Sequence, residues 1–178
     1  SLAGALGPVL TPLMKLITFL GEKGLLLLLL SLVLMCFART RRIGVCVFGA
    51  VCCGALITNF ILKDWIARPR PFETVDLYRQ WWQTVGSPAE DGYSFPSGHT
   101  QNIVGTTASL FACRKEKWVR IVCAVLMVLV PFSRMYLGVH TPLDVGVSFV
   151  LALALAAALY PAFRTEQTAK KATPWILL

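Results

Sequence analysis

Three short polar segments in an otherwise apolar chain carry the residue types that could bind and transfer a phosphoryl group. They run from Lys63 to Pro71, from Pro96 to His99 and from Ser133 to Asp144, and each lies at the end of an apolar stretch. Cationic side chains and helix N-termini bind phosphate oxygens, and imidazole can act as a nucleophile or an acid near neutral pH. We therefore expect the three segments to meet around one phosphate.

The first segment holds three cations, Lys63, Arg68 and Arg70, and prolines fix the backbone beside the arginines. Arginine offers a planar pair of donors to phosphate oxygens, and lysine offers a compact point charge. Lys63 alone could instead extend its ammonium group from a membrane boundary to water. Three cations so close together favour phosphate binding.

The second segment, Pro96-Ser97-Gly98-His99, precedes an apolar run. Gly98 lets the backbone approach a ligand closely, and a helix that begins here would point its first amide groups at an anion. Ser97 can donate another hydrogen bond, and His99 can protonate a leaving oxygen. The alternative is a helix-capping serine beside a structural histidine.

In the third segment, His140 and Asp144 are four residues apart at the start of an expected helix, so they share one face. A carboxylate that accepts from one imidazole nitrogen fixes the tautomer and leaves the other nitrogen free to attack. Arg134, about two helical turns earlier, adds a phosphate ligand. A purely structural pairing of His140 with Asp144 is the alternative.

Together these segments resemble the signature of the type 2 phosphatidic acid phosphatase (PAP2) superfamily. The matching patterns are Lys63-x6-Arg70-Pro71, Pro96-Ser97-Gly98-His99 and Ser133-Arg134-x5-His140-x3-Asp144. The resemblance implies an all-helical membrane phosphatase in which His140 is the nucleophile and forms a phosphohistidine. By the same resemblance Asp144 would orient His140, and His99 would protonate the leaving group.

The resemblance also implies five ligands for the phosphoryl oxygens, which are Lys63, Arg70, Ser97, Gly98 and Arg134. It implies no metal and no other cofactor. Arg68 lies outside the signature. Members commonly have six spans and the chain begins at Ser1 without a recognisable secretory signal, so we expect a core that lacks an upstream span.

Composition places the chain in a membrane. Hydrophobic residues make up 56% of it and charged residues 15%, whereas soluble domains carry about 25% charged residues. The net charge of +8 arises from basic residues that cluster between apolar stretches, which predicts membrane topology and an anionic ligand rather than nucleic acid. The six cysteines lie in apolar runs without the spacing of a zinc site, so we expect buried free thiols and no metal centre.

The apolar stretches predict an all-α polytopic transmembrane bundle of about five spans, preceded by an N-terminal interfacial helix. Leu10 to Leu20 is amphipathic and too short to cross a bilayer, although it could also be the tail of an upstream span. The expected spans are Gly24–Ala38, Ile43–Leu62, Ser94–Cys113, Ile121–Leu137 and Thr141–Phe163.

Alternation of five spans puts Arg39–Arg42, Arg114–Arg120 and Arg164–Lys171 on one side, with ten of the 17 basic residues. Basic loops favour the cytoplasm, so the three polar segments are predicted to face outward. We expect one domain: an interfacial helix in 1–23, a catalytic transmembrane core in 24–163 and a cytoplasmic tail in 164–178.

The expected function is hydrolysis of a lipid phosphate or pyrophosphate headgroup at the outer face of a cell membrane. The short loops and small size favour undecaprenyl pyrophosphate as substrate, followed by phosphatidylglycerophosphate, phosphatidic acid and lipid A 1-phosphate. One alternative is a lipid phosphotransferase, which would need the same residues and an acceptor pocket. The other is a non-catalytic lipid-phosphate carrier, and His99, His140 and Asp144 argue against this second alternative. Soluble haloperoxidases share the signature, but the apolar spans exclude that setting.

We also expect Glu73–Asp91 to act as a lid that carries Trp81 and Trp82.

Overall fold

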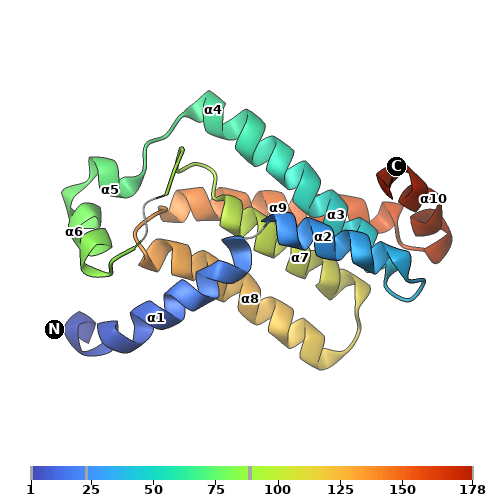
Figure 1. Cartoon of the computed structure of the whole chain (residues 1–178), viewed down its shortest axis with the longest axis horizontal. Coiled ribbons are helices and arrows are strands. Elements are labelled where there is room, and N and C mark those ends of the chain that lie inside the picture. Colours follow the sequence, from blue (N-terminus) through green and yellow to red (C-terminus); the bar gives the residue numbers. More distant parts are fainter. Residues whose placement is uncertain (1, 23, 88–89, 178) are drawn as a thin grey trace.

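The computed structural model describes residues 2–22, 24–87 and 90–177, and within them every regular element is a helix (Figure 1). The predicted all-α class is confirmed. In chain order the elements are α1 (Leu2–Glu22), α2 (Gly24–Cys36), α3 (Arg41–Ala55), the π-helical segment η1 (Leu56–Leu62), α4 (Lys63–Ile66), α5 (Pro71–Thr74), α6 (Asp76–Thr84), α7 (Gly98–Cys113), α8 (Lys117–Tyr136), α9 (Pro142–Ala162) and α10 (Glu166–Leu177).

Helix α7 lies at the centre of the bundle, in contact with α1, α3, α8 and α9. Small residues allow this close packing, as is usual between membrane helices. A Cβ atom added to Gly105 would lie 3.4 Å from the Cβ atom of Ala50 on α3. The Ser109 hydroxyl donates to the carbonyls of Gly105 (2.8 Å) and Cys46 (3.3 Å). Neighbours on several sides therefore fix α7, whose first two residues, Gly98 and His99, belong to the second polar segment.

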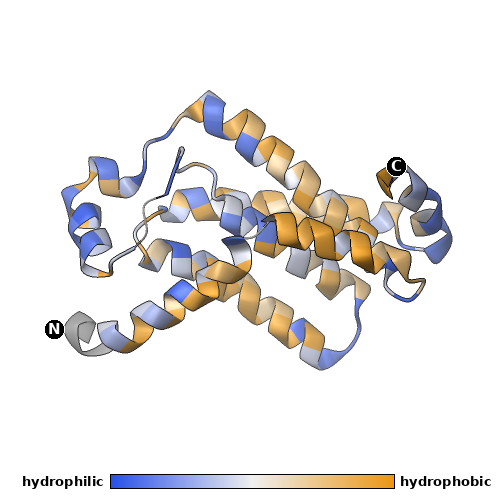
Figure 2. Ribbon diagram, in the orientation of Figure 1, coloured by the Kyte–Doolittle hydropathy of each residue, from blue (hydrophilic) through white to orange (hydrophobic). Residues whose placement is uncertain are grey.

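The long helices are largely apolar along their length (Figure 2), and many of their large apolar side chains are exposed. In the described residues three stretches, Arg41–Thr74, Lys117–Tyr136 and Pro142–Ala162, are long and apolar enough to cross a membrane. A fourth candidate is the pair Gly7–Glu22 and Gly24–Cys36, whose axes differ by 53°. Helix α7 has 16 residues, fewer than the roughly 20 that a hydrocarbon core requires. Five spans therefore remain a prediction.

The helices differ from the predicted elements in three places. Helix α1 extends well beyond the amphipathic stretch Leu10–Leu20 and packs on α7 and α8. The first four residues of the predicted span Ser94–Cys113 precede α7, because Ser97 is its N-cap. The chain after Arg164 forms α10, which packs against α3 and is joined to it by the Arg41–Glu166 ion pair.

The segment between η1 and α7, which holds the predicted lid Glu73–Asp91, contains the short helices α4, α5 and α6. Helices α5 and α6 lie at one end of the molecule, and α10 lies at the opposite end (Figure 1). The prolines do interrupt the helix, since Arg68–Arg70 is non-helical and α5 begins at Pro71. Proline is well suited to that first position because its missing N–H has no helical partner there.

Candidate active site

The three polar segments meet at the end of the bundle that carries α5 and α6, as the sequence predicted. Six of the eight predicted site residues line one cavity of about 350 Å³, and these are Lys63, Arg70, Gly98, His99, Arg134 and His140. Thr18, Glu22, Glu90 and Asp91 complete its lining. Ser97 and Asp144 are fully buried and are not part of the lining.

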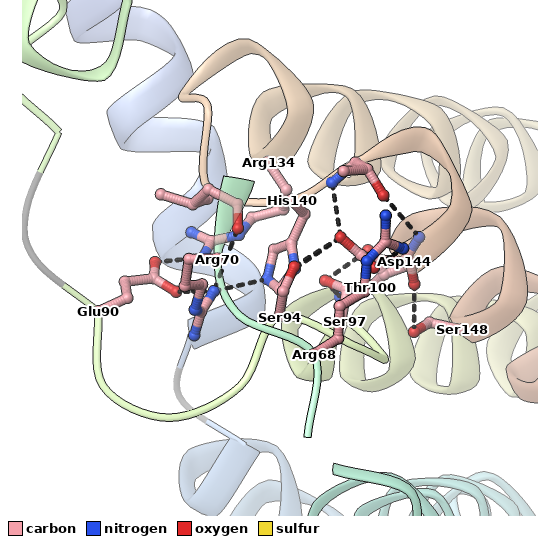
Figure 3. Close-up of polar contacts among 12 residues, drawn as sticks. Arg68, Arg70, Glu90, Ser94, Ser97, Thr100, Arg134, His140, Asp144 and Ser148 are labelled. Atoms are coloured by element: carbon pink, nitrogen blue, oxygen red, sulfur yellow. Dashed lines mark hydrogen bonds and ion pairs between the residues drawn. The ribbon is translucent and has the colours of Figure 1, made fainter. Parts of the chain in front are cut away.

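His140 lies on the turn between α8 and α9. Helix α8 ends at Tyr136 with Leu137 as its C-cap, and Gly138 turns the chain with φ of +73°, a conformation that favours glycine. The imidazole is 2% exposed, and its Nε2 lies 3.2 Å from Nη1 of Arg70 (Figure 3). Nδ1 lies 3.9 Å from Oδ2 of Asp144 and has no hydrogen-bond partner in the described residues. The predicted neighbours are therefore adjacent without forming a hydrogen bond in this structure.

The environment of His140 favours the neutral imidazole. Burial lowers its pKa well below the usual range, and the positive charges of Arg134 and Arg70 lower it further. A neutral imidazole has one nitrogen with a free lone pair. Because arginine can only donate, Nε2 is the nitrogen that presents its lone pair, and it faces Nη1 of Arg70 at the wall of the cavity.

Asp144 is held from several sides by groups that neutralise or solvate its carboxylate. Arg68 donates to Oδ1 (3.0 Å), while the Ser94 hydroxyl (2.6 Å) and the backbone N–H of Thr141 (2.7 Å) donate to Oδ2. The side chain of Thr141 caps α9 in return by accepting from the N–H of Asp144. A buried carboxylate is costly unless it is paired in this way.

These contacts add two residues to the site. Arg68 was noted as lying outside the signature, and Ser94 was treated only as the first residue of a span. No sequence spacing connects Arg68 or Ser94 with Asp144, since they are 76 and 50 residues away. The backbone N–H of Ser94 also donates to the carbonyl of Arg68 (2.8 Å), so the two residues approach Asp144 as a pair.

Ser97 occupies the capping position that the sequence left as an alternative. Its hydroxyl oxygen accepts from the N–H (3.4 Å) and the hydroxyl (3.1 Å) of Thr100, and its own N–H donates to the carbonyl of Asp144 (3.2 Å). Donation from Ser97 to a phosphate remains a prediction. Gly98 and His99 belong to the first turn of α7 and line the cavity, where helical N–H groups have no intrahelical acceptor.

The two buried arginines are fixed by protein groups. Arg70, 3% exposed, donates to the carbonyls of Asp91 (3.0 Å), Gly92 (3.1 Å) and Val139 (3.3 Å). Arg134, 2% exposed, donates from Nη1 to the hydroxyl of Thr18 on α1 (2.8 Å). Its Nε has no hydrogen-bond partner in the part of the chain that the structure describes.

Glu90 joins these two arginines, and sequence reasoning missed it. Its carboxylate is 3.1 Å from Nη1 of Arg70 and forms an ion pair with Nη2 of Arg134. Burial alone would raise the pKa of Glu90, but the charge and hydrogen bond of Arg134 hold the pKa below its usual range. The carboxylate is therefore ionised at neutral pH.

Within the described residues, no group of three or more potential metal ligands gathers here or elsewhere.

Trp81 and Trp82 lie beside the cavity and not in its lining. Trp82 stacks on Phe72 with ring centroids 4.7 Å apart, and Nε1 of Trp81 donates to the carbonyl of Tyr136 (2.5 Å). Both tryptophans pack against a buried apolar cluster that includes Leu137 and Val139, which precede His140 in the chain. From the predicted lid segment, Glu90 and Asp91 reach the cavity wall. Lid movement remains a prediction.

Comparisons with known proteins agree with this arrangement. A family model described as the PAP2 superfamily matches residues 44–168. Undecaprenyl-diphosphatase from Sulfolobus acidocaldarius is 36% identical over 118 residues, which are 66% of this chain and 54% of that protein. Phosphatidylglycerophosphatase B from Bacillus subtilis is 34% identical, with 83% of this chain and 72% of that protein covered. This chain thus spans about half the length of the archaeal relative and more of the bacterial one.

A solved structure gives the same result in three dimensions. The crystal structure of a transmembrane PAP2 type phosphatidylglycerolphosphate phosphatase from Bacillus subtilis superposes with a TM-score of 0.67 at 30% identity. The superposition covers 86% of this chain and 76% of the other. The family model spans the three polar segments that form the cavity, and together with the relatives it shows that the chain belongs to the PAP2 superfamily.

Proposed function

We propose that the protein is a membrane lipid phosphatase that hydrolyses a phosphomonoester or diphosphate headgroup through a phosphohistidine on His140. The observation that carries the proposal is the position of this imidazole, with Nε2 beside Arg70 in a cationic cavity and Asp144 behind Nδ1. A carrier needs cations to bind phosphate, but it does not need a buried carboxylate behind a histidine. The arrangement therefore favours catalysis.

In the first step Nε2 of His140 attacks the terminal phosphorus, and the bond from this phosphorus to its leaving oxygen breaks. The leaving oxygen is the lipid alcohol oxygen of a phosphomonoester, or the oxygen that bridges the two phosphates of a diphosphate, in which case the lipid monophosphate departs. His99 gives a proton to that leaving oxygen, while Asp144 accepts a hydrogen bond from Nδ1 and stabilises the positive charge that develops on the ring. Lys63, Arg70, Arg134 and the first amides of α7 hold the equatorial oxygens, with Ser97 as a further donor. Preorganised donors of this kind stabilise the transition state more than the substrate.

In the second step water attacks phosphorus, His99 accepts its proton, and the phosphorus–nitrogen bond breaks. Inorganic phosphate leaves and His140 is restored. The protein's own residues supply each proton transfer in this scheme, so the proposed reaction is metal-independent.

The favoured substrate is undecaprenyl diphosphate, which agrees with the names of relatives from two organisms. Phosphatidylglycerophosphate is the second candidate, because the relative named phosphatidylglycerophosphatase B matches over 83% of this chain. The distribution of basic loops supports an active site on the outer face of the membrane. The lipid tail would remain in the bilayer beside the apolar helices.

The proposal is tested by phosphate release from the purified full chain in detergent with a metal chelator present. Undecaprenyl diphosphate, phosphatidylglycerophosphate and phosphatidic acid are compared at equal mole fraction. We expect release from all three and the highest kcat/KM for undecaprenyl diphosphate. A higher value for phosphatidylglycerophosphate would assign that substrate instead, and no release from any of the three would reject the phosphatase.

Histidine titration tests the electrostatics of the site. The chain has 2 histidines, so ring-labelled histidine gives two NMR signals, and the His99→Gln variant assigns them. Because the pKa of His140 is well below its usual range, its signal should keep the neutral position as the pH falls through about 6.5, the value of a free imidazole. A His140 midpoint at or above about 6.5 would contradict this account.

Ser94→Ala tests whether the reaction needs the hydrogen bond from the Ser94 hydroxyl to the carboxylate of Asp144. The variant removes the hydroxyl that donates to Oδ2, and a hydrogen bond worth about 1 kcal/mol corresponds to a loss of kcat of roughly five- to tenfold. Ser148→Ala is the matched control, since this buried serine donates to the backbone carbonyl of Asp144 and not to its carboxylate. Equal losses in both variants would show a general packing effect.

A further inference from the structure

Glu90 occupies the position where an anion would bridge the two arginines of the cavity. One carboxylate oxygen faces Arg70 at 3.1 Å, and the other pairs with Arg134 (Figure 3). Carboxylate and phosphate present oxygens to a guanidinium group in much the same geometry. The side chain thus holds the place that the proposed function gives to phosphoryl oxygens.

Within the described residues, the contacts of Arg70 occupy its Nη1, the nitrogen that faces His140 and Glu90. Its Nε and Nη2 donate to the carbonyls of Gly92 and Asp91, and Nη1 faces Glu90, His140 and the carbonyl of Val139. A phosphate oxygen can reach Nη1 of Arg70 only by replacing the oxygen of Glu90. The same exchange would free Nη2 of Arg134.

The charges of the cavity point to the same exchange. Three cations, Lys63, Arg70 and Arg134, line it together with three acidic residues, Glu22, Glu90 and Asp91. A phosphate bound beside Glu90 would place two anions between the same guanidinium groups, and like charges repel strongly at such short range. Departure of Glu90 removes this repulsion.

We propose that Glu90 sets the phosphate affinity of the cavity by competing, as a tethered carboxylate, for Arg70 and Arg134. The inference rests on the proposed function, since it places phosphate oxygens on these two arginines. Because Glu90 belongs to the same chain, its effective concentration at the site is high. It lowers the affinity of every phosphate ligand by one common factor, set by the fraction of molecules in which the arginines are free of Glu90.

The lowered phosphate affinity affects both the binding of headgroups and the release of inorganic phosphate. Phosphodiester headgroups of the bilayer lipids are abundant around the cavity. Because such a headgroup binds the arginines only weakly, it cannot displace Glu90 and does not block the site. After hydrolysis, the return of Glu90 to Arg70 and Arg134 displaces inorganic phosphate and empties the site.

The test uses the purified full chain in detergent with inorganic phosphate as the probe. Phosphate affinity is obtained from the rise in unfolding temperature with phosphate concentration, and KM is measured with undecaprenyl diphosphate. Glu90→Gln keeps the shape of the side chain and removes its charge. We expect this variant to bind phosphate at least about tenfold more tightly, because a charge-assisted contact no longer competes. KM should fall by the same factor.

Asp91→Asn is the matched control. Asp91 also lines the cavity, but its side chain is exposed, and only its backbone carbonyl contacts Arg70. Its phosphate affinity should change by no more than about twofold, since exposed charges are well screened. Glu90→Gln with unchanged or weaker phosphate affinity would overturn the inference, and so would equal gains in both variants.

The binding measurement separates this inference from the proposed function. If the wild-type protein hydrolyses no lipid while Glu90→Gln still binds phosphate more tightly than Asp91→Asn, the phosphatase is rejected and the role of Glu90 stands. If the wild-type protein is active and Glu90→Gln shows no gain in phosphate affinity, the phosphatase stands and the role of Glu90 is rejected.

Discussion

His140→Ala is expected to reduce the rate of phosphate release by at least about a thousandfold, because loss of a nucleophile removes the covalent route altogether. Other groups in the cavity would still bind the headgroup, so KM should change much less than kcat. The measurement is the initial rate of release in detergent micelles, compared with wild-type protein at equal folded concentration.

The His140→Gln variant controls for the loss of packing. Glutamine can accept a hydrogen bond from Arg70, which is the contact that Nε2 makes in the structure, and it fills part of the same buried volume. Both variants should be equally inactive if the imidazole is the nucleophile. Recovery of activity in His140→Gln to within about tenfold of wild type would instead assign a positioning role to this residue.

Arg70→Lys is expected to lower kcat/KM by about 100- to 1,000-fold, the usual cost of removing a donor that stabilises transition-state charge. The substitution keeps the positive charge, but a lysine cannot reproduce the planar set of donors. Arg70 contacts His140, Glu90 and three backbone carbonyls at once. The loss should therefore appear mainly in kcat.

Arg79→Lys on α6 is the matched control for this prediction. Arg79 is 45% exposed and pairs with Asp76, away from the residues that line the cavity. An exposed pair of this kind contributes about 0–1 kcal/mol to stability. Its replacement should leave activity close to wild type, and an Arg70→Lys variant as active as Arg79→Lys would contradict the role of Arg70.

The convergence of the three polar segments was predictable from sequence because each carries chemistry at the end of an apolar stretch. Lys63, His99 and His140 are far apart in the chain, but alternating spans place the ends of successive helices on common faces. The helix cap at Ser97 and the capping box of Thr141 and Asp144 are local patterns, so they too can be anticipated from neighbouring residues.

The contacts that sequence reasoning missed depend on long-range packing. Arg68 and Ser94 reach Asp144 across 76 and 50 residues, and Thr18 reaches Arg134 across 116 residues. Glu90 reaches Arg134 from the segment Glu73–Asp91, for which the sequence predicted a lid but no contact with an arginine. Periodicity reports which face of a helix is apolar, but it does not report which helix or loop will lie against that face.

Trapping of the phosphorylated protein tests the central claim most directly. The purified chain is mixed with lipid substrate carrying labelled phosphate and quenched in base, under which phosphohistidine survives whereas phosphoserine and phosphothreonine do not. The modified residue is then identified by mass spectrometry of the peptides. The account predicts base-stable, acid-labile label on His140, absent from His140→Ala. Label on another residue, or rapid turnover with no trapped label on His140, would contradict it.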